Sequence, residues 1–355
     1  TPKEQRTPFN GGIWRYHPVT HEFELFGEGG GNSWGVEFDR YGNVFSAGNE
    51  VEPLVHMVQG GYYVKGFGKH GPLHNPHTYG YFMPVKHIGY LGDSLSGGAV
   101  IYQGGAFPER FSNNVIAPHT RHSATRWATI RPLGSTFVTE HAGDFITTSD
   151  IWFRPIEQTV GPDGALYAAD WYDFNISHSN PQNRSEWYQP SRFDGRVWRV
   201  APPELKPIAS DSFDLGARSS AELVDLLTHP NDWYARQAQR LLAERRDRSA
   251  APQLQELLVS DDQRTALEGL WSLYVIGAFD DVLAAQTLNS PHEYVRSWTV
   301  RLLGDAKEIP EALHPELVEL ARADSSPVVR SQLACTAKRL PGAHCVPIVR
   351  ELLRH

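Results

Sequence analysis

The chain has 355 residues, of which 40% are hydrophobic and 21% are charged. This ordinary globular composition argues against disordered and fibrous proteins, and a net charge of −8 without a basic block makes nucleic acid an unfavourable partner. No run of about 18 apolar residues occurs, so the sequence predicts no membrane-spanning helix. The length exceeds the roughly 100–200 residues typical of one domain, which indicates two domains.

The composition changes near residue 203. Residues 1–203 hold 26 of the 31 glycines and 7 of the 10 tryptophans, whereas the rest is rich in Leu, Ala, Arg and Glu. The first composition is typical of short strands with tight turns and the second of helices. We therefore predict a β domain over residues 1–203 and a helical domain over residues 204–355. Because the sequence begins at Thr1 without Met or a leader-like segment, we expect a processed or truncated product.

Two segments of the β domain, residues 34–48 and 154–170, repeat a pattern of strand, glycine turn and strand. The second contains Pro162-Asp163-Gly164, which are residues that a tight turn favours. A further repeat relates residues 12–16 to residues 196–200, and its two copies start 184 residues apart. Repeated strand pairs are typical of propellers, which usually close with four to eight blades. We predict a partial β-propeller with about 3–4 blades; a β-sandwich is the alternative.

In a propeller blade, the first strand begins and the second strand ends at the same face, so polar residues at these positions should gather at one opening. The residues that enter first strands are Asn32, Trp34, Asp150, Trp152 and Arg154. Those that leave second strands are Glu50, Asp170, Trp171 and Asp173, followed by His178. We predict that this opening is the functional site.

The side chains at the opening suit three tasks. The candidate catalytic residues are Arg154, His178 and Asp150, because Arg can hold a carboxylate with two hydrogen bonds and His can act as a base. The candidate cofactor-binding residues are Asn32, Trp34, Trp152 and Trp171, because an indole can stack on a sugar or quinone ring. The candidate Ca²⁺ ligands are Asp170, Asp173 and Glu50, because Ca²⁺ takes oxygen ligands.

Each assignment has a structural alternative. Asp170 could instead accept hydrogen bonds from backbone amides at the strand end, Arg154 could pair with Asp150 or Glu157, and the tryptophans could pack between blades. Two further histidine groups, within residues 70–77 and 119–122, are interpreted as solvated loop residues rather than as transition-metal ligands.

The second domain has apolar residues at helical spacing, such as Leu223, Leu226 and Leu227. Four segments each combine a polar or proline-containing turn with an arginine near the start of a helix; these arginines are Arg236, Arg264, Arg296 and Arg330. Stacked helix pairs share a core that one pair cannot bury alone. We predict an all-α HEAT-like solenoid that acts as a scaffold, with an irregular helical domain as the alternative.

Both cysteines, Cys335 and Cys345, fall in this helical domain on either side of Pro341-Gly342. An antiparallel helix pair would bring them together, so we predict a disulfide if the compartment is oxidising; reduced buried thiols are the alternative. Neither cysteine belongs to a C-x-x-C-H motif, so the sequence predicts no covalently attached haem.

Several segments of the first domain resemble one known family. They include Gly60-Gly61-Tyr62-Tyr63 and the stretches 73–82, 101–111, 132–145 and 150–173. They are similar to the membrane-bound dehydrogenases of planctomycete-type bacteria, also described as haem-binding propellers. The resemblance implies a six-bladed propeller related to soluble pyrroloquinoline-quinone sugar dehydrogenases, followed by HEAT-like repeats and often by a cytochrome c module. Here the cytochrome module and the early blades are missing from the pattern.

The resemblance leads to a functional hypothesis. It implies a periplasmic or exported oxidoreductase that oxidises a sugar or alcohol by hydride transfer to pyrroloquinoline quinone held with Ca²⁺. The expected partners are a sugar or glycan-like small molecule and a second polypeptide that supplies missing blades or a cytochrome. Two alternatives are a non-catalytic glycan- or protein-binding assembly module and a metal-dependent lactonase or lyase, since six-bladed propellers also host those reactions.

Overall fold

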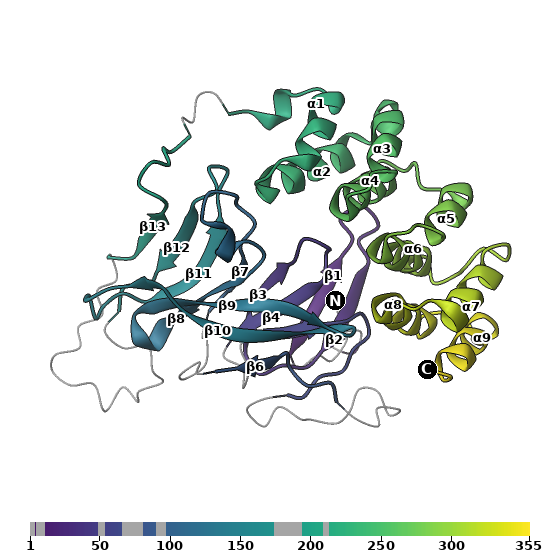
Figure 1. The fold of residues 1–355 in the computed structure, drawn as a ribbon, viewed down its shortest axis with the longest axis horizontal. Helices are drawn as coiled ribbons and strands as arrows, with labels where there is room; N and C mark the ends of the chain where they lie inside the picture. Colours follow the sequence, from purple (N-terminus) through teal and green to yellow (C-terminus); the bar gives the residue numbers. More distant parts are fainter. Residues whose placement is uncertain are drawn as a thin grey trace. The chain divides into compact units, whose positions relative to one another are not determined.

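The computed structural model describes residue 4 and residues 11–48, 54–65, 81–89, 97–173, 194–208 and 213–355. The chain divides into two compact units, Thr1–Leu205 and Lys206–His355. In the described residues the first unit consists of several β-sheets and the second of α-helices (Figure 1). The predicted order of a strand-rich part followed by a helical part is therefore confirmed.

Two sheets of the first unit are three-stranded antiparallel meanders. The β3–β5 sheet consists of β3 (Ser33–Phe38), β4 (Val44–Gly48) and β5 (Leu54–Met57) in that order. The β11–β13 sheet consists of β11 (Pro155–Val160), β12 (Leu166–Asp170) and β13 (Arg196–Val200).

The other two sheets differ in size. The β6–β10 sheet has the order β6-β10-β9-β8-β7. Its strands are β6 (Lys86–Ile88), β7 (Val100–Ile101), β8 (Val115–His119), β9 (Ala124–Leu133) and β10 (Thr136–Thr147), and β6 pairs with β10 in parallel while the other pairs are antiparallel. The β1–β2 sheet joins β1 (Gly12–Tyr16) and β2 (Phe23–Glu28).

The predicted tight turns join the first two strands of both meanders. Between β3 and β4, Asp39 Oδ1 accepts hydrogen bonds from the backbone N–H groups of Tyr41 and Asn43, both at 2.9 Å. Between β11 and β12, Asp163 Oδ1 accepts from Ala165 N at 3.1 Å, and Gly164 has a φ of +78°. A positive φ favours glycine because it has no Cβ, so the turn prediction at these positions is confirmed.

Hydrophobic cores lie between successive sheets. Phe45 and Leu54 of the β3–β5 sheet pack with Val115 and Phe137 of the β6–β10 sheet. In the next core, residues of the β6–β10 sheet such as Val100 and Ile116 pack with Leu166 of the β11–β13 sheet. The sheets therefore stack face to face in chain order, as blades would.

Glycines allow β3, the segment before β7 and β11 to lie close together. A Cβ placed on Gly35 of β3 would lie 2.9 Å from Cα of Gly98, just before β7. A Cβ on Gly97 would in turn lie 2.3 Å from the backbone oxygen of Ile156 on β11. Only glycine allows backbones to approach this closely. The three sheets therefore lie close together along these strands. That they are propeller blades, and how many blades there are, stay predictions.

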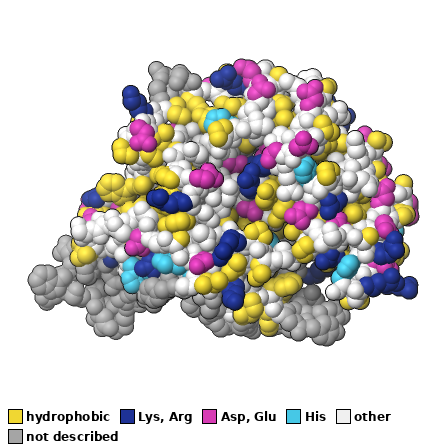
Figure 2. Space-filling view, in the orientation of Figure 1, with side chains coloured by type: hydrophobic (Ala, Val, Ile, Leu, Met, Phe, Trp, Pro, Cys, Tyr) yellow, Lys and Arg dark blue, Asp and Glu magenta, His cyan; other side chains and the backbone are white. Residues whose placement is uncertain are grey.

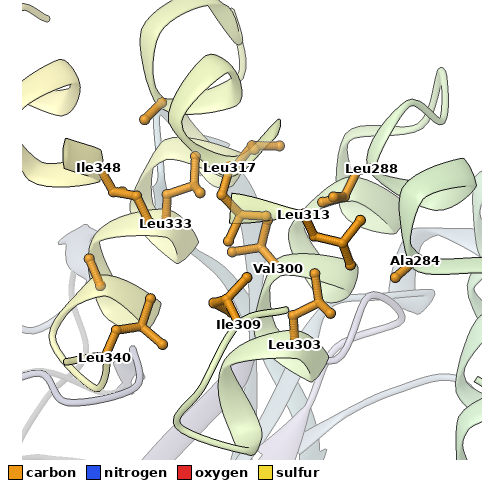
Figure 3. Close-up of a cluster of buried hydrophobic side chains, with 13 residues drawn as sticks. Ala284, Leu288, Val300, Leu303, Ile309, Leu313, Leu317, Leu333, Leu340 and Ile348 are labelled. Atoms are coloured by element: carbon orange, nitrogen blue, oxygen red, sulfur yellow. The ribbon is translucent and has the colours of Figure 1, made fainter. Parts of the chain in front are cut away.

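The second unit contains stacked helices. They are α1 (Ser220–Asp225), α2 (Asp232–Arg245), α3 (Ala251–Leu258), α4 (Gln263–Val275), α5 (Asp281–Leu288), α6 (Glu293–Asp305), α7 (His314–Ala323), α8 (Pro327–Ala337) and α9 (Gly342–Leu352). Helices α2, α4, α6 and α8 pack in succession. Figure 3 shows a core formed by α5 to α9, in which Val300 and Leu303 of α6 lie near Leu313 and Leu317.

The repeated arginines connect neighbouring helical turns. Arg264 Nη2 lies 2.5 Å from Asp232 Oδ1 of the preceding repeat, and Arg296 donates to both oxygens of Asp324 in the following repeat, at 2.8 and 3.0 Å. Arg330 also donates to the Asp324 backbone oxygen at 2.6 Å. Arg264 and Arg296 therefore connect repeats, whereas Arg330 bonds within its own segment, and the HEAT-like class stays a prediction.

The predicted disulfide is wrong. Cys335 of α8 and Cys345 of α9 are not joined, and both thiols are half-buried. Of the helices that the structure describes, none has the length and apolar character needed to cross a membrane. On the face drawn in Figure 2, Lys and Arg side chains are interspersed with Asp and Glu, as expected for a chain without a basic block.

Candidate functional site

The turn before β11 is organised by Asp150. Its backbone N–H donates to Thr148 Oγ1 at 3.0 Å, and its Oδ1 accepts from Trp152 N at 2.9 Å. Phe153 N donates to the Asp150 backbone oxygen at 3.2 Å. Such side-chain acceptors stabilise tight turns, so Asp150 holds the segment that delivers Arg154 to the start of β11.

Arg154 is buried at the point where β11 begins. Its Nη1 donates to Phe153 O at 2.8 Å and also to Ser123 Oγ. Burial lowers the pKa of Arg154, while the negative charges of Asp173, Asp170 and Asp150 oppose this shift. An arginine stays protonated under such conditions, so the site holds a buried cation in the electrostatic field of three carboxylates.

Asp170, the last residue of β12, is 3% exposed, and its carboxylate accepts three hydrogen bonds. Oδ1 accepts from Arg154 N at 2.8 Å and from Tyr172 N at 2.9 Å, and Oδ2 accepts from the indole Nε1 of Trp198 at 2.9 Å. The carboxylate therefore ties the start of β11 to the end of β12 and to β13. This is the role that strand-end capping predicts.

Aromatic side chains surround the residues that follow β12. Trp171 is 60% exposed. Tyr172 has a φ of +50°, which is uncommon outside glycine, and its ring lies 5.8 Å from that of Trp152. The guanidinium of Arg196 lies 3.8 Å from the Tyr172 ring centroid, a distance at which cation–π attraction is favourable.

A short turn between β8 and β9 reaches the same place. Thr120 Oγ1 donates to Pro155 O at 2.7 Å, and Ser123, with a φ of +52°, accepts from Arg154. The His119 and His122 rings are stacked with centroids 4.3 Å apart. His119 is fully buried, so the interpretation of this histidine as a solvated loop residue is wrong.

The structure brings together six of the predicted site residues at one end of the β11–β13 sheet: Asp150, Trp152, Arg154, Asp170, Trp171 and Asp173. Asn32 and Trp34 lie at the start of β3 in another sheet. Glu50, His178 and the histidines within residues 70–77 lie outside the described residues.

Sequence reasoning missed Ser123, Tyr172 and Arg196 at this site. Residues 119–123 form a polar run between two strand-like segments, and this run was the available sequence signal for Ser123. No sequence signal pointed to Arg196, because it reaches the site only through the pairing of β13 with β12.

The described residues do not fit the predicted Ca²⁺ site. Asp170 uses both oxygens for N–H donors, and within the described ranges no three His, Cys, Asp or Glu side chains are grouped to share a metal ion. Of the predicted site residues, Trp171 is exposed and Asp173 is partly exposed, whereas Arg154 and Asp170 are buried.

Known structures with some similarity to this chain include glucose dehydrogenases. An oxidoreductase assigned as a glucose dehydrogenase from the bacterium Thermus thermophilus has 20% sequence identity and a TM-score of 0.33, over 50% of this chain and 46% of that chain. A second glucose dehydrogenase has 17% identity and a TM-score of 0.32, over 52% and 49%. This chain thus spans about half the length of those proteins.

An engineered protein has 21% identity and a TM-score of 0.23, over 38% of this chain and 69% of that one. The curated proteins contain no match. A family model described as a domain of unknown function, DUF7133, matches residues 1–204. That match covers more than half of the sequence, and the chain belongs to the DUF7133 family.

Proposed function

We propose that the end of the β11–β13 sheet binds a sugar or a related polyol, as the substrate site of a sugar-dehydrogenase-like oxidoreductase. The observations that carry the proposal are the buried Arg154, whose charge lies in the field of three carboxylates, and the exposed Trp171, whose backbone N–H donates to Arg154 O at 2.8 Å. Carboxylates accept hydrogen bonds from sugar hydroxyls, and an indole covers the C–H face of a sugar ring. The resemblance to quinone-dependent sugar dehydrogenases supports the same class of reaction.

The residues have distinct tasks in this proposal. Trp171 stacks on the ring, and the carboxylate of Asp173 accepts hydrogen bonds from its hydroxyls. Arg154 supplies a fixed positive charge at the site; it moves no proton, because a guanidinium stays charged. Pyrroloquinoline quinone would supply the hydride acceptor, and no Ca²⁺ is assigned to Asp170. A HEAT-like scaffold and a periplasmic or exported location complete the proposal.

The test measures binding and turnover separately. Calorimetry with a panel of aldoses and alditols should give saturable binding that Trp171→Ala weakens by about tenfold, a typical effect of losing an aromatic anchor. Tyr16→Ala is the matched control, because Tyr16 is an exposed aromatic residue of the β1–β2 sheet. Failure of every sugar to bind, or equal losses in both variants, would contradict the proposal.

A non-catalytic glycan-binding module is the second candidate. The full engagement of the Asp170 carboxylate by N–H donors favours it, because that carboxylate then serves structure and not proton transfer. Dye reduction in the presence of pyrroloquinoline quinone and Ca²⁺ distinguishes the two functions. Sugar-dependent reduction supports the oxidoreductase, whereas binding without reduction supports the module.

A further inference from the structure

Arg196 holds an exposed positive charge at the end of the β11–β13 sheet. It is the first residue of β13 and pairs across the sheet with Asp170. Its guanidinium carbon lies 3.8 Å from the ring centroid of Tyr172 and 5.7 Å from that of Trp198. The first distance is too short for an N–H group to point at the ring, so the guanidinium stacks on Tyr172 through its face. The stacking fixes the position of an otherwise flexible side chain.

The N–H donors of this guanidinium are unused. They lie in its plane and therefore point away from the Tyr172 ring. In the part of the chain that the structure describes, no oxygen accepts from them. Arg199 on the same strand differs, because its Nε donates to Asp163 Oδ2 at 2.7 Å. The carboxylate of Asp170, opposite Arg196, already accepts three other N–H groups. A planar fork of donors held in place without an acceptor suits an oxyanion.

The charges around the site favour one place for a negative group. Arg154 is buried, and its Nη1 already donates to two oxygens of the protein. The carboxylates of Asp150 and Asp173 act on Arg154 and would repel an anion. Arg196 is exposed and stacked on the residue that directly follows the exposed Trp171. An anionic ligand at this end of the sheet would therefore place its charged group on Arg196.

We propose that Arg196 makes the site selective for acidic sugars, by binding the carboxylate of a uronate through two hydrogen bonds while the sugar ring stacks on Trp171. The inference rests on the proposed sugar site and adds the class of sugar that it takes. A carboxylate presents two oxygens in one plane, which match two parallel N–H groups of a guanidinium. A phosphate ester shares the negative charge but carries its oxygens tetrahedrally, so the test includes one.

The test measures a ratio of affinities within each variant. Calorimetry compares glucuronate with glucose and galacturonate with galactose, and glucose 6-phosphate is a further ligand. The parent chain should bind each uronate about tenfold more tightly than the neutral sugar, and added NaCl should reduce this ratio. Arg196→Gln should bring the ratio close to one, whereas Arg196→Lys should keep part of it, because an ammonium has charge but no fork.

Arg110→Gln is the matched control. Arg110 is also exposed, and its guanidinium lies 4.8 Å from the ring centroid of Phe111 in another part of the first unit. Its replacement should leave the ratio of affinities as in the parent. A purely structural role of Arg196 would weaken uronates and neutral sugars equally and would leave the ratio unchanged.

Four outcomes would overturn the inference. Equal binding of uronates and neutral sugars, or a preference that survives Arg196→Gln, would refute it and leave the sugar site standing. Tighter binding of glucose 6-phosphate than of glucuronate would refute the carboxylate. Loss of pyrroloquinoline quinone binding in Arg196→Gln, with the uronate preference intact, would assign the guanidinium to the quinone. Failure of every sugar to bind would refute both this inference and the proposed function.

Discussion

The carboxylate of Asp170 joins β11, β12 and β13 through its three hydrogen bonds, an arrangement that we call the strand clamp, and it makes a quantitative prediction. Asp170→Ala would remove the acceptor of one buried N–H, that of Arg154, and of two partly buried ones, those of Tyr172 and Trp198. An unsatisfied buried donor costs about 1–3 kcal/mol and a partly hydrated one costs less, so we expect a total loss of roughly 2–5 kcal/mol in the free energy of unfolding. Asp170→Asn keeps one acceptor oxygen for the two backbone groups and should lose less, about 1–3 kcal/mol.

A double-mutant cycle isolates the contact with the indole. In Asp170→Asn the new amide group faces the Trp198 N–H, so two donors oppose each other, and Trp198→Phe removes one of them. The two substitutions should therefore be less destabilising together than their sum, by about 1 kcal/mol. Urea unfolding is followed by tryptophan fluorescence for the strand unit and by far-ultraviolet circular dichroism for the helical unit.

Additive losses in this cycle would refute the clamp. A rise in the unfolding midpoint with Ca²⁺ in the parent chain that disappears in Asp170→Asn would also refute it. That result would restore Asp170 as a metal ligand. Protection of the start of β11 from hydrogen exchange gives an independent readout, which should fall in Asp170→Ala before the helical unit changes.

Three further predictions concern single sites. Burial raises the pKa of Glu268 in α4 from 4.5 to about 7. Because the folded state binds the proton more tightly than the unfolded state, the free energy of unfolding should fall by up to about 3 kcal/mol as pH rises from 4.5 to 7. The variant Glu268→Gln should abolish this pH dependence. Gly97→Ala would place a Cβ 2.3 Å from a carbonyl oxygen of β11 and should lower stability by about 1–3 kcal/mol; Gly342→Ala, with open space around it, should show no loss of melting temperature. Arg296→Lys breaks a two-point contact with the buried Asp324 and should lower the urea midpoint of the helical unit clearly. The control Arg322→Lys changes an exposed pair and should leave that midpoint unchanged. Equal midpoints for the two variants would contradict the role of Arg296 in connecting repeats.

Local patterns in the sequence predicted much of the fold. The turns at Asp39 and at Pro162-Asp163-Gly164 could be predicted because the side-chain acceptor and the positive φ act within a few residues. The helices could be predicted from their apolar spacing, and the repeat of their segments singled out Arg264 and Arg296, although not the aspartates that these arginines contact.

The roles of individual side chains were decided by contacts between distant segments. Asp170 meets Trp198 from a strand 28 residues later, and Arg154 meets Ser123 from a turn 31 residues earlier. His119 is buried although a polar run, residues 120–123, follows it. Sequence alone determined which groups stand at strand ends and which residues make turns, because these depend on local backbone geometry. Only the packing and pairing of distant strands decided that the carboxylate of Asp170 accepts three N–H groups and that the indole of Trp171 is exposed. The reason is that burial and hydrogen-bond partners are properties of the folded chain.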